Sequence, residues 1–258
     1  RQRQMCIRDR FLNIAVSISA ACLTYAVCLY MAELLLHVSA VHEAGYICSM
    51  LFIIPGFPFI TSGIDLAKLD LRSGLERLTY SIIIVLVATM FAWIMALLLK
   101  LQPQDFVALH LGSMMHLVLR LIASFCGVFG FSIMFNSSVY IAATAACIGA
   151  VANTLRLELV DYTGMPSAAA AFIGALTAGL LASIIKRNHG YPRISLTVPS
   201  IVIMVPGLYL YRAIYNFGIM SLTEAVLWFA AAIMIIVSLP LGLIFARILT
   251  DRTFRYCS

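Results

Sequence analysis

Two apolar stretches carry a Pro-Gly pair at the same position, LFIIPGF at residues 51–57 and VIMVPGL at residues 202–208. Each is followed by a polar stretch containing aromatic residues, and then by an acidic residue, Glu76 or Glu224, that opens a long apolar segment. A Pro-Gly pair alone would carry little weight, but the matching order on both sides indicates an internal duplication. The rest of the chain is interpreted from this duplication.

The whole chain is apolar enough to need lipid as its solvent. Of its 258 residues, 63% are hydrophobic and only 11% are charged, and the mean hydropathy is +1.02. Soluble domains carry about 25% charged residues, and in lipid only helices or closed barrels satisfy the backbone hydrogen bonds. The apolar runs are long enough to cross a hydrocarbon core of about 30 Å as helices. We therefore predict an all-α integral membrane protein.

The apolar runs predict eight membrane spans, of which the second and seventh are short or interrupted by proline. They lie at roughly 11–36, 44–60, 77–101, 117–135, 138–158, 166–186, 195–213 and 224–249. Because the number is even, both termini are expected on the same side of the membrane.

The basic residues indicate which side this is. Nine lie on the side of the termini, namely Lys68, Arg72, Arg77, Lys186, Arg187, Arg193, Arg247, Arg252 and Arg255. Four lie on the opposite side, namely Lys100, Arg120, Arg156 and Arg212. The positive-inside rule then places both termini in the cytoplasm. The net charge of +6 is therefore a sign of topology, and binding to nucleic acid is not expected.

The duplication aligns the first three spans with the last three, in opposite directions across the membrane. Inverted repeats with interrupted helices at corresponding positions are typical of secondary transporters, whose substrate site lies near the midplane. We predict a first repeat at residues 11–101 with three spans, a linker at 102–116, and a second repeat at 117–258 with five spans. The complete architecture is therefore expected to have about ten spans, and residues 1–10, RQRQMCIRDR, are interpreted as a non-native leader.

The prolines predict where the interrupted spans expose their backbone. Proline lacks an N–H group and displaces the carbonyl one turn earlier, so Pro55 should free the carbonyl of Leu51, and Pro206 that of Val202. Two more prolines are expected to add second breaks to the same spans, Pro58 and Pro199. The alternative is a simple packing kink. The predicted substrate or ion pathway includes both pairs, Pro55 with Gly56 and Pro206 with Gly207.

Charged side chains at membrane depth are costly and are therefore candidates for function. Arg156 and Glu158 form the strongest candidate pair. The Arg156 guanidinium could clamp the carboxylate of a substrate through two N–H groups. Asn153 lies one turn before Arg156. The alternative is an interfacial pair whose long side chains extend to the headgroups.

Two further candidates follow the interrupted spans, Asp65 after the first and Arg212 after the second. Asp65 could carry a proton if it lay in a low-dielectric vestibule, where burial favours the neutral carboxyl group. The alternative for Asp65 is a hydrated amphipathic loop. Glu76 and Glu224 simply suit the positive ends of helix dipoles.

The same residues resemble those of the threonine/serine exporter (ThrE) family. The first part of the resemblance rests on Pro55, Gly56, Asp65, Ser73, Gly74, Leu75, Arg77 and Leu78, which match the end of the family's first membrane domain. The second part rests on GAVANTLRLEL and IMVPGLYLYRAIY, which resemble the second membrane domain. The chain departs from the family where Ile54 replaces the commoner valine before the first Pro-Gly pair. From the resemblance we also expect that the family's first two spans and its preceding cytoplasmic segment are missing from the given sequence.

The resemblance implies ten spans in the complete protein and efflux of small polar metabolites across a bacterial inner membrane. Threonine and serine are the type substrates, and the proton gradient is the expected driving force. Two-subunit relatives imply a dicarboxylate as the alternative substrate, and a non-transporting subunit or scaffold is a further alternative. An enzyme is not expected, since the sequence shows no catalytic, metal or cofactor motif. A homo-oligomeric state is left open.

Overall fold

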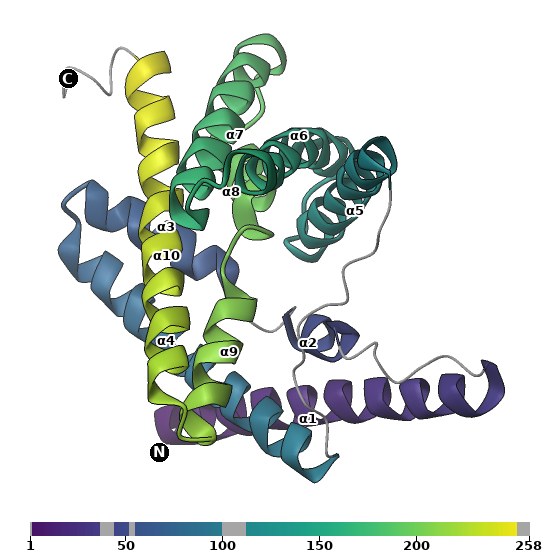
Figure 1. Cartoon of the computed structure of the whole chain (residues 1–258). Coiled ribbons are helices and arrows are strands. Elements are labelled where there is room, and N and C mark those ends of the chain that lie inside the picture. Colours follow the sequence, from purple (N-terminus) through teal and green to yellow (C-terminus); the bar gives the residue numbers. More distant parts are fainter. Residues whose placement is uncertain (1, 37–43, 52–54, 100–111, 252–258) are drawn as a thin grey trace. The chain divides into compact units, whose positions relative to one another are not determined.

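The computed structural model describes residues 2–36, 44–51, 55–99 and 112–251, which form ten helices and no strands (Figure 1). Six helices are long and apolar enough to span a membrane. These are α1 (Gln2–Leu36), α4 (Leu71–Leu98), α5 (Ser113–Met134), α6 (Val139–Thr163), α7 (Ser167–His189) and α10 (Leu222–Thr250). The prediction of an all-α membrane protein is confirmed.

Two further spans are interrupted, which brings the number to eight when each interrupted pair is counted as one span. These pairs are α2 (Ala44–Leu51) with α3 (Gly56–Ala67), and α8 (Arg193–Val202) with α9 (Gly207–Gly218). Both interruptions end at the Pro-Gly pairs that the sequence analysis singled out.

The two interrupted spans repeat at a constant separation along the chain. The same 151 positions separate the ends of α2 and α8, both ends of α3 and α9, and the starts of α4 and α10. No insertion or deletion therefore divides the two copies between Leu51 and Leu71. This confirms the predicted duplication at the level of the backbone.

The turns that follow α3 and α9 repeat in the same way. Leu69 and Met220 are equivalent, and both adopt left-handed backbone angles, with φ of 65° and 63°. In each turn the next residue donates its N–H five positions back, Asp70 to Asp65 at 3.1 Å and Ser221 to Asn216 at 2.9 Å. These bonds form the Schellman motif that ends a helix with a left-handed residue.

The helices form two compact units, and each unit is built from both halves of the chain. The first unit comprises Arg1–Pro55, Thr79–Leu109 and Gly207–Ala232, and the second comprises Gly56–Leu78, His110–Pro206 and Ile233–Ser258. The division falls at both Pro-Gly bonds. In the first unit α2 packs on α9, and in the second unit the equivalent helices α8 and α3 pack together.

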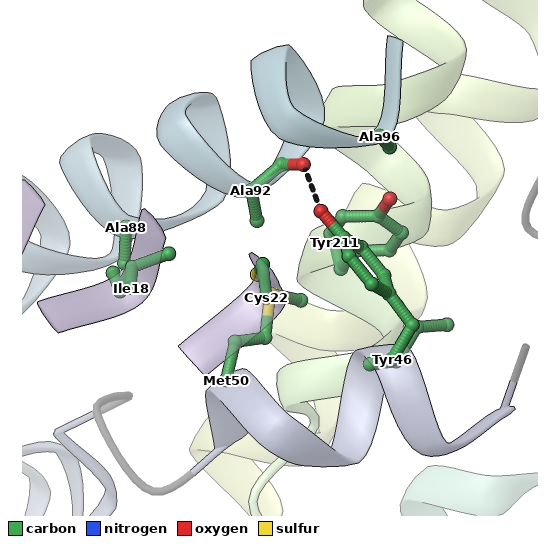
Figure 2. Close-up of a cluster of buried hydrophobic side chains, with 9 residues drawn as sticks. Ile18, Cys22, Tyr46, Met50, Ala88, Ala92, Ala96 and Tyr211 are labelled. Atoms are coloured by element: carbon green, nitrogen blue, oxygen red, sulfur yellow. Dashed lines mark hydrogen bonds between the residues drawn. The ribbon is translucent and has the colours of Figure 1, made fainter. Parts of the chain in front are cut away.

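The core of the first unit gathers side chains from α1, α2, α4 and α9 (Figure 2). The hydroxyl group of Tyr46 donates to the Ala92 carbonyl at 2.6 Å, which satisfies a polar group inside an apolar cluster. Three buried alanines at four-residue spacing, Ala88, Ala92 and Ala96, form the contact face of α4. Small residues at this spacing allow helices to approach closely in a membrane.

The second unit is organised around α6, which packs against α5, α7 and α8 (Figure 1). Gly149 allows the approach of α8, because a Cβ atom at Gly149 would lie 2.9 Å from the Ser200 carbonyl oxygen. Ser200 in turn donates its hydroxyl to the Ala145 carbonyl at 2.9 Å. This core holds α6 in a fixed position beside the second interruption.

The expected second breaks at Pro58 and Pro199 are wrong. Pro58 lies in the first turn of α3, where the missing N–H would have no partner within the helix. Pro199 lies inside α8, which continues to Val202. In membrane helices neighbouring helices and hydroxyl side chains compensate for an internal proline.

Some boundaries differ from those predicted. α5 begins at Ser113, inside the predicted linker, of which residues 102–111 lie outside the described residues. α1 begins at Gln2, within the predicted leader, and the non-native origin of residues 1–10 stays a prediction.

Candidate functional site

The second interruption forms a tight turn between α8 and α9. The Met204 N–H donates to the Ile201 carbonyl at 2.9 Å, and the Val205 N–H donates to the Val202 carbonyl at 3.2 Å. The prediction that Pro206 leaves the Val202 carbonyl free is therefore wrong, because a turn of the 3₁₀ type supplies a donor. The corresponding prediction for Leu51 depends on residues 52–54, which lie outside the described residues.

Arg156 reaches this turn from α6. Its Nη1 donates to the carbonyl of Met204 at 3.3 Å, so the interruption supplies a different backbone acceptor from the one expected. Gly174 on α7 makes the arrangement compact, because a Cβ atom there would lie 3.3 Å from both the Arg156 Cβ and the Met204 Sδ. The helices α6 and α7 and the turn at Met204 thus meet around the Arg156 side chain.

A buried polar pair lies one helical turn before Arg156. Asn153 donates through Nδ2 to the Ser124 hydroxyl at 2.8 Å, and both residues are buried. The Asn153 Oδ1 and the Thr154 hydroxyl are also buried and have no hydrogen-bond partner among the residues that the structure describes. Since buried polar atoms are usually paired, these atoms suit a polar ligand or water.

The glycine of the first Pro-Gly pair meets the second interruption within the second unit. A Cβ atom at Gly56 would lie 2.7 Å from the Val202 Cγ2 and 3.6 Å from the Val202 carbonyl oxygen. The start of α3 therefore rests directly on the end of α8. The structure thus brings Gly56, Asn153, Arg156 and Pro206 into one compact unit.

Glu158 has a partner on another helix that the sequence did not suggest. Its carboxylate accepts from Arg120 Nη1 on α5 at 2.9 Å, and Arg120 Nη2 also pairs with Asp161. The side chains of Arg120 and Glu158 are only 18% and 19% exposed, so this pair is largely withdrawn from water. Sequence reasoning missed Arg120 and Asp161 as partners.

The remaining candidate residues belong to the first unit or pair with other side chains. Asp65 accepts from Arg77 Nη1 at 2.7 Å in the second unit. Arg212 lies in the first unit, with its guanidinium carbon 4.7 Å from the centre of the Trp228 ring. Pro55 and Gly207 also belong to the first unit. Within the described part of the chain, no group of three or more His, Cys, Asp or Glu residues could hold a metal ion.

Two family models match the chain, and together they cover most of its length. Residues 120–249 match the family model described as "Threonine/Serine exporter, ThrE", and residues 2–100 match the family model described as "Putative threonine/serine exporter". The chain belongs to the threonine/serine exporter family. No curated protein and no solved structure matches the chain.

Family membership makes this exporter chain a multi-pass membrane protein of a transporter family. The two matches follow the two repeats that the resemblance indicated. In the exporter, Asn153, Arg156 and the second interruption lie within the match at 120–249, and Gly56 lies within the match at 2–100. Both matched parts therefore contribute to the unit that holds Arg156.

Proposed function

We propose that the exporter moves threonine, serine or a closely similar small polar metabolite, and that Arg156 binds its carboxylate. Arg156 carries the proposal, because it is a guanidinium held at an interrupted helix by the Met204 carbonyl. Interrupted helices in corresponding repeats mark the binding sites of secondary transporters. A guanidinium suits a carboxylate through two parallel N–H bonds.

Asn153 favours an amino acid over a dicarboxylate. Its Oδ1 accepts no hydrogen bond from the described residues, and an acceptor of this kind suits an ammonium or hydroxyl group. A dicarboxylate would need a second cation, and the nearby candidate Arg120 already pairs with Glu158 and Asp161. Threonine and serine present all three groups that this set of partners can bind.

Proton coupling is assigned to Asp65, and the orientation is assigned from the basic residues. Protonation of the Asp65 carboxylate would remove its charge and weaken its ion pair with Arg77, which lies at the start of α4. Binding of a proton to Asp65 would therefore weaken a contact between α3 and α4. The bias of basic residues supports both termini in the cytoplasm, and the family match supports a bacterial inner membrane.

The test is transport by the full chain in reconstituted vesicles, with labelled threonine, serine and succinate supplied separately. We expect proton-linked flux of threonine or serine, and a loss of about 10- to 100-fold on Arg156→Gln, since a hydrogen bond to a charged group contributes about 1.5–3 kcal/mol. Arg72→Gln is the matched control, because Arg72 is 91% exposed and pairs only locally with Glu76. Flux of succinate alone would favour the dicarboxylate, and unchanged flux in Arg156→Gln would overturn the assignment.

A further inference from the structure

A separate cavity of about 480 Å³ lies in the second unit, where α7 ends, α8 begins and α10 ends. Its lining includes Lys186, Arg187 and Arg193, together with the polar residues Ser183, Thr250 and Asp251. None of these belongs to the proposed substrate site. The cavity is within the range of about 300–1,000 Å³ that is usual for small-molecule sites.

The lining is strongly cationic. Three basic side chains face one carboxylate, that of Asp251. The Asp251 carboxylate also pairs with a fourth cation outside the lining, because its Oδ2 lies 3.7 Å from the Nε of Arg247. Like charges around one cavity repel each other, and an anion bound between them would remove the repulsion.

Arg193 is held in place by neutral oxygens. Its Nη1 donates to the Thr250 hydroxyl at 3.2 Å, and its Nη2 donates to the Gly179 carbonyl at 3.3 Å. The Thr250 hydroxyl is itself fixed, because it donates to the Ala246 carbonyl at 2.7 Å. These bonds use two of the five N–H groups of the guanidinium, and they orient the charge without neutralising it.

Helix dipoles account for some of these cations but not for Arg193. Lys186 and Arg187 lie near the C-terminal end of α7, where positive charge is favourable. Arg193 is the first residue of α8, where the helix dipole disfavours a positive charge. A fixed cation at an unfavourable helix end, lining a cavity with two other cations, indicates an anionic ligand.

We propose that this cavity binds a phosphate group, carried either by an anionic lipid headgroup or by a soluble phosphate. Arginine and lysine are the side chains that recognise phosphate. The cavity lies at the helix ends that the basic-residue bias places in the cytoplasm, and basic pockets between membrane helices on that side suit anionic headgroups. Binding there would tie together α7, α8 and α10.

The test measures thermal unfolding of the full purified chain with added phosphatidylglycerol, phosphatidylcholine or inorganic phosphate, since a ligand of the folded state raises Tm. We expect phosphatidylglycerol or inorganic phosphate to raise Tm and phosphatidylcholine to have no effect. Lys186→Gln/Arg187→Gln should weaken the apparent affinity at least about tenfold. Lys68→Gln/Arg72→Gln is the matched control, because it removes the same charge from exposed positions outside the cavity.

The two sources of phosphate separate cleanly. A rise with phosphatidylglycerol but not with inorganic phosphate identifies a lipid headgroup, and the reverse identifies a soluble phosphate. Arg193→Gln provides a second variant that removes the charge while retaining hydrogen-bond donors, and it should lose the same response. Equal responses in the site variants and the control variant, or no response to either phosphate source, would overturn the proposal.

Discussion

The two copies of the interrupted span share one backbone but carry different chemistry. Both have a Pro-Gly pair, a twelve-residue helix and a Schellman turn at the same separation. In the first copy Asp65 pairs with Arg77, and the positions equivalent to these two are Asn216 and Trp228 in the second copy. There the ring of Trp228 contacts Arg212 instead. The same backbone elements thus carry an ion pair in one repeat and a cation–π contact in the other.

This difference suggests a division of work between the copies. The first copy carries the Asp65 carboxylate, and the second copy has the uncharged Asn216 at the equivalent position. The second copy offers its interruption to Arg156, through the Met204 carbonyl. We therefore propose that the first copy serves coupling and that the second serves substrate binding.

The first prediction concerns the carboxylate of Asp65, whose equivalent in the second copy is the amide of Asn216. Asp65→Asn should reduce proton-driven export at least about tenfold, because the amide cannot carry a proton. A tenfold loss corresponds to about 1.4 kcal/mol. Exchange of substrate at equal concentrations on both sides should persist. The reverse change at the equivalent position, Asn216→Asp, should leave proton-driven export nearly unchanged. Equal effects of both variants in vesicles with an imposed pH gradient would remove the proposed division.

The second prediction concerns the contact between the two copies within the second unit. Gly56→Ala would place a Cβ atom 2.7 Å from the Val202 Cγ2, and we expect a loss of about 1–3 kcal/mol in unfolding free energy. Val202→Ala removes that methyl group, so the double variant should recover part of the loss. Gly130→Ala is the control, because a Cβ atom at Gly130 would have no neighbour within 4 Å. The unfolding free energies of the two single variants, the double variant and the control are compared with that of the unmodified chain by thermal unfolding in detergent. A loss that Val202→Ala does not reduce would contradict the contact.

The third prediction compares the contacts made by Arg77 and Trp228, which occupy equivalent positions in the two copies. Arg77→Gln should cost about 0.2–1 kcal/mol, since Arg77 is 54% exposed and water screens its ion pair. Trp228→Leu should cost about 0.5–1 kcal/mol through the lost cation–π contact. Double-variant cycles with Asp65→Asn and with Arg212→Gln isolate each pair in thermal unfolding. A coupling energy near zero for Arg212 and Trp228 would mean that the cation–π contact of the second copy does not stabilise the fold.

The features that depend on composition and order were predictable from the sequence. Long apolar runs predict the six uninterrupted spans and the two interrupted ones, and the repeated Pro-Gly pair indicates the duplication. Arg120 was predictable in principle, because α5 and α6 fold back on each other at residues 135–138. The same antiparallel register that brings Ser124 to Asn153 also brings Arg120 to Glu158.

Other features depend on local backbone geometry that composition does not encode. Proline at position 206 predicts a missing donor for Val202, but a three-residue turn supplies one from Val205. Which carbonyl then meets Arg156 depends on how α6 packs beside that turn. The ion pair of Glu158 also depends on Arg120, a cation in another helix that lies 38 positions away along the chain.

The last prediction tests whether the two Schellman turns are energetically equivalent. A residue with a side chain in the left-handed region costs about 1–2 kcal/mol, which glycine avoids. Leu69 and Met220 are each 83% exposed, so removing their side chains should lose little packing. Leu69→Gly and Met220→Gly should therefore both stabilise the chain, by about 0.5–1 kcal/mol once the greater freedom of the unfolded glycine is counted. Leu69→Ala and Met220→Ala are the controls and should show no gain, because alanine retains the Cβ atom. If only one glycine variant raises Tm, the two copies share a fold but not the same strain, and their divergence extends to the backbone itself.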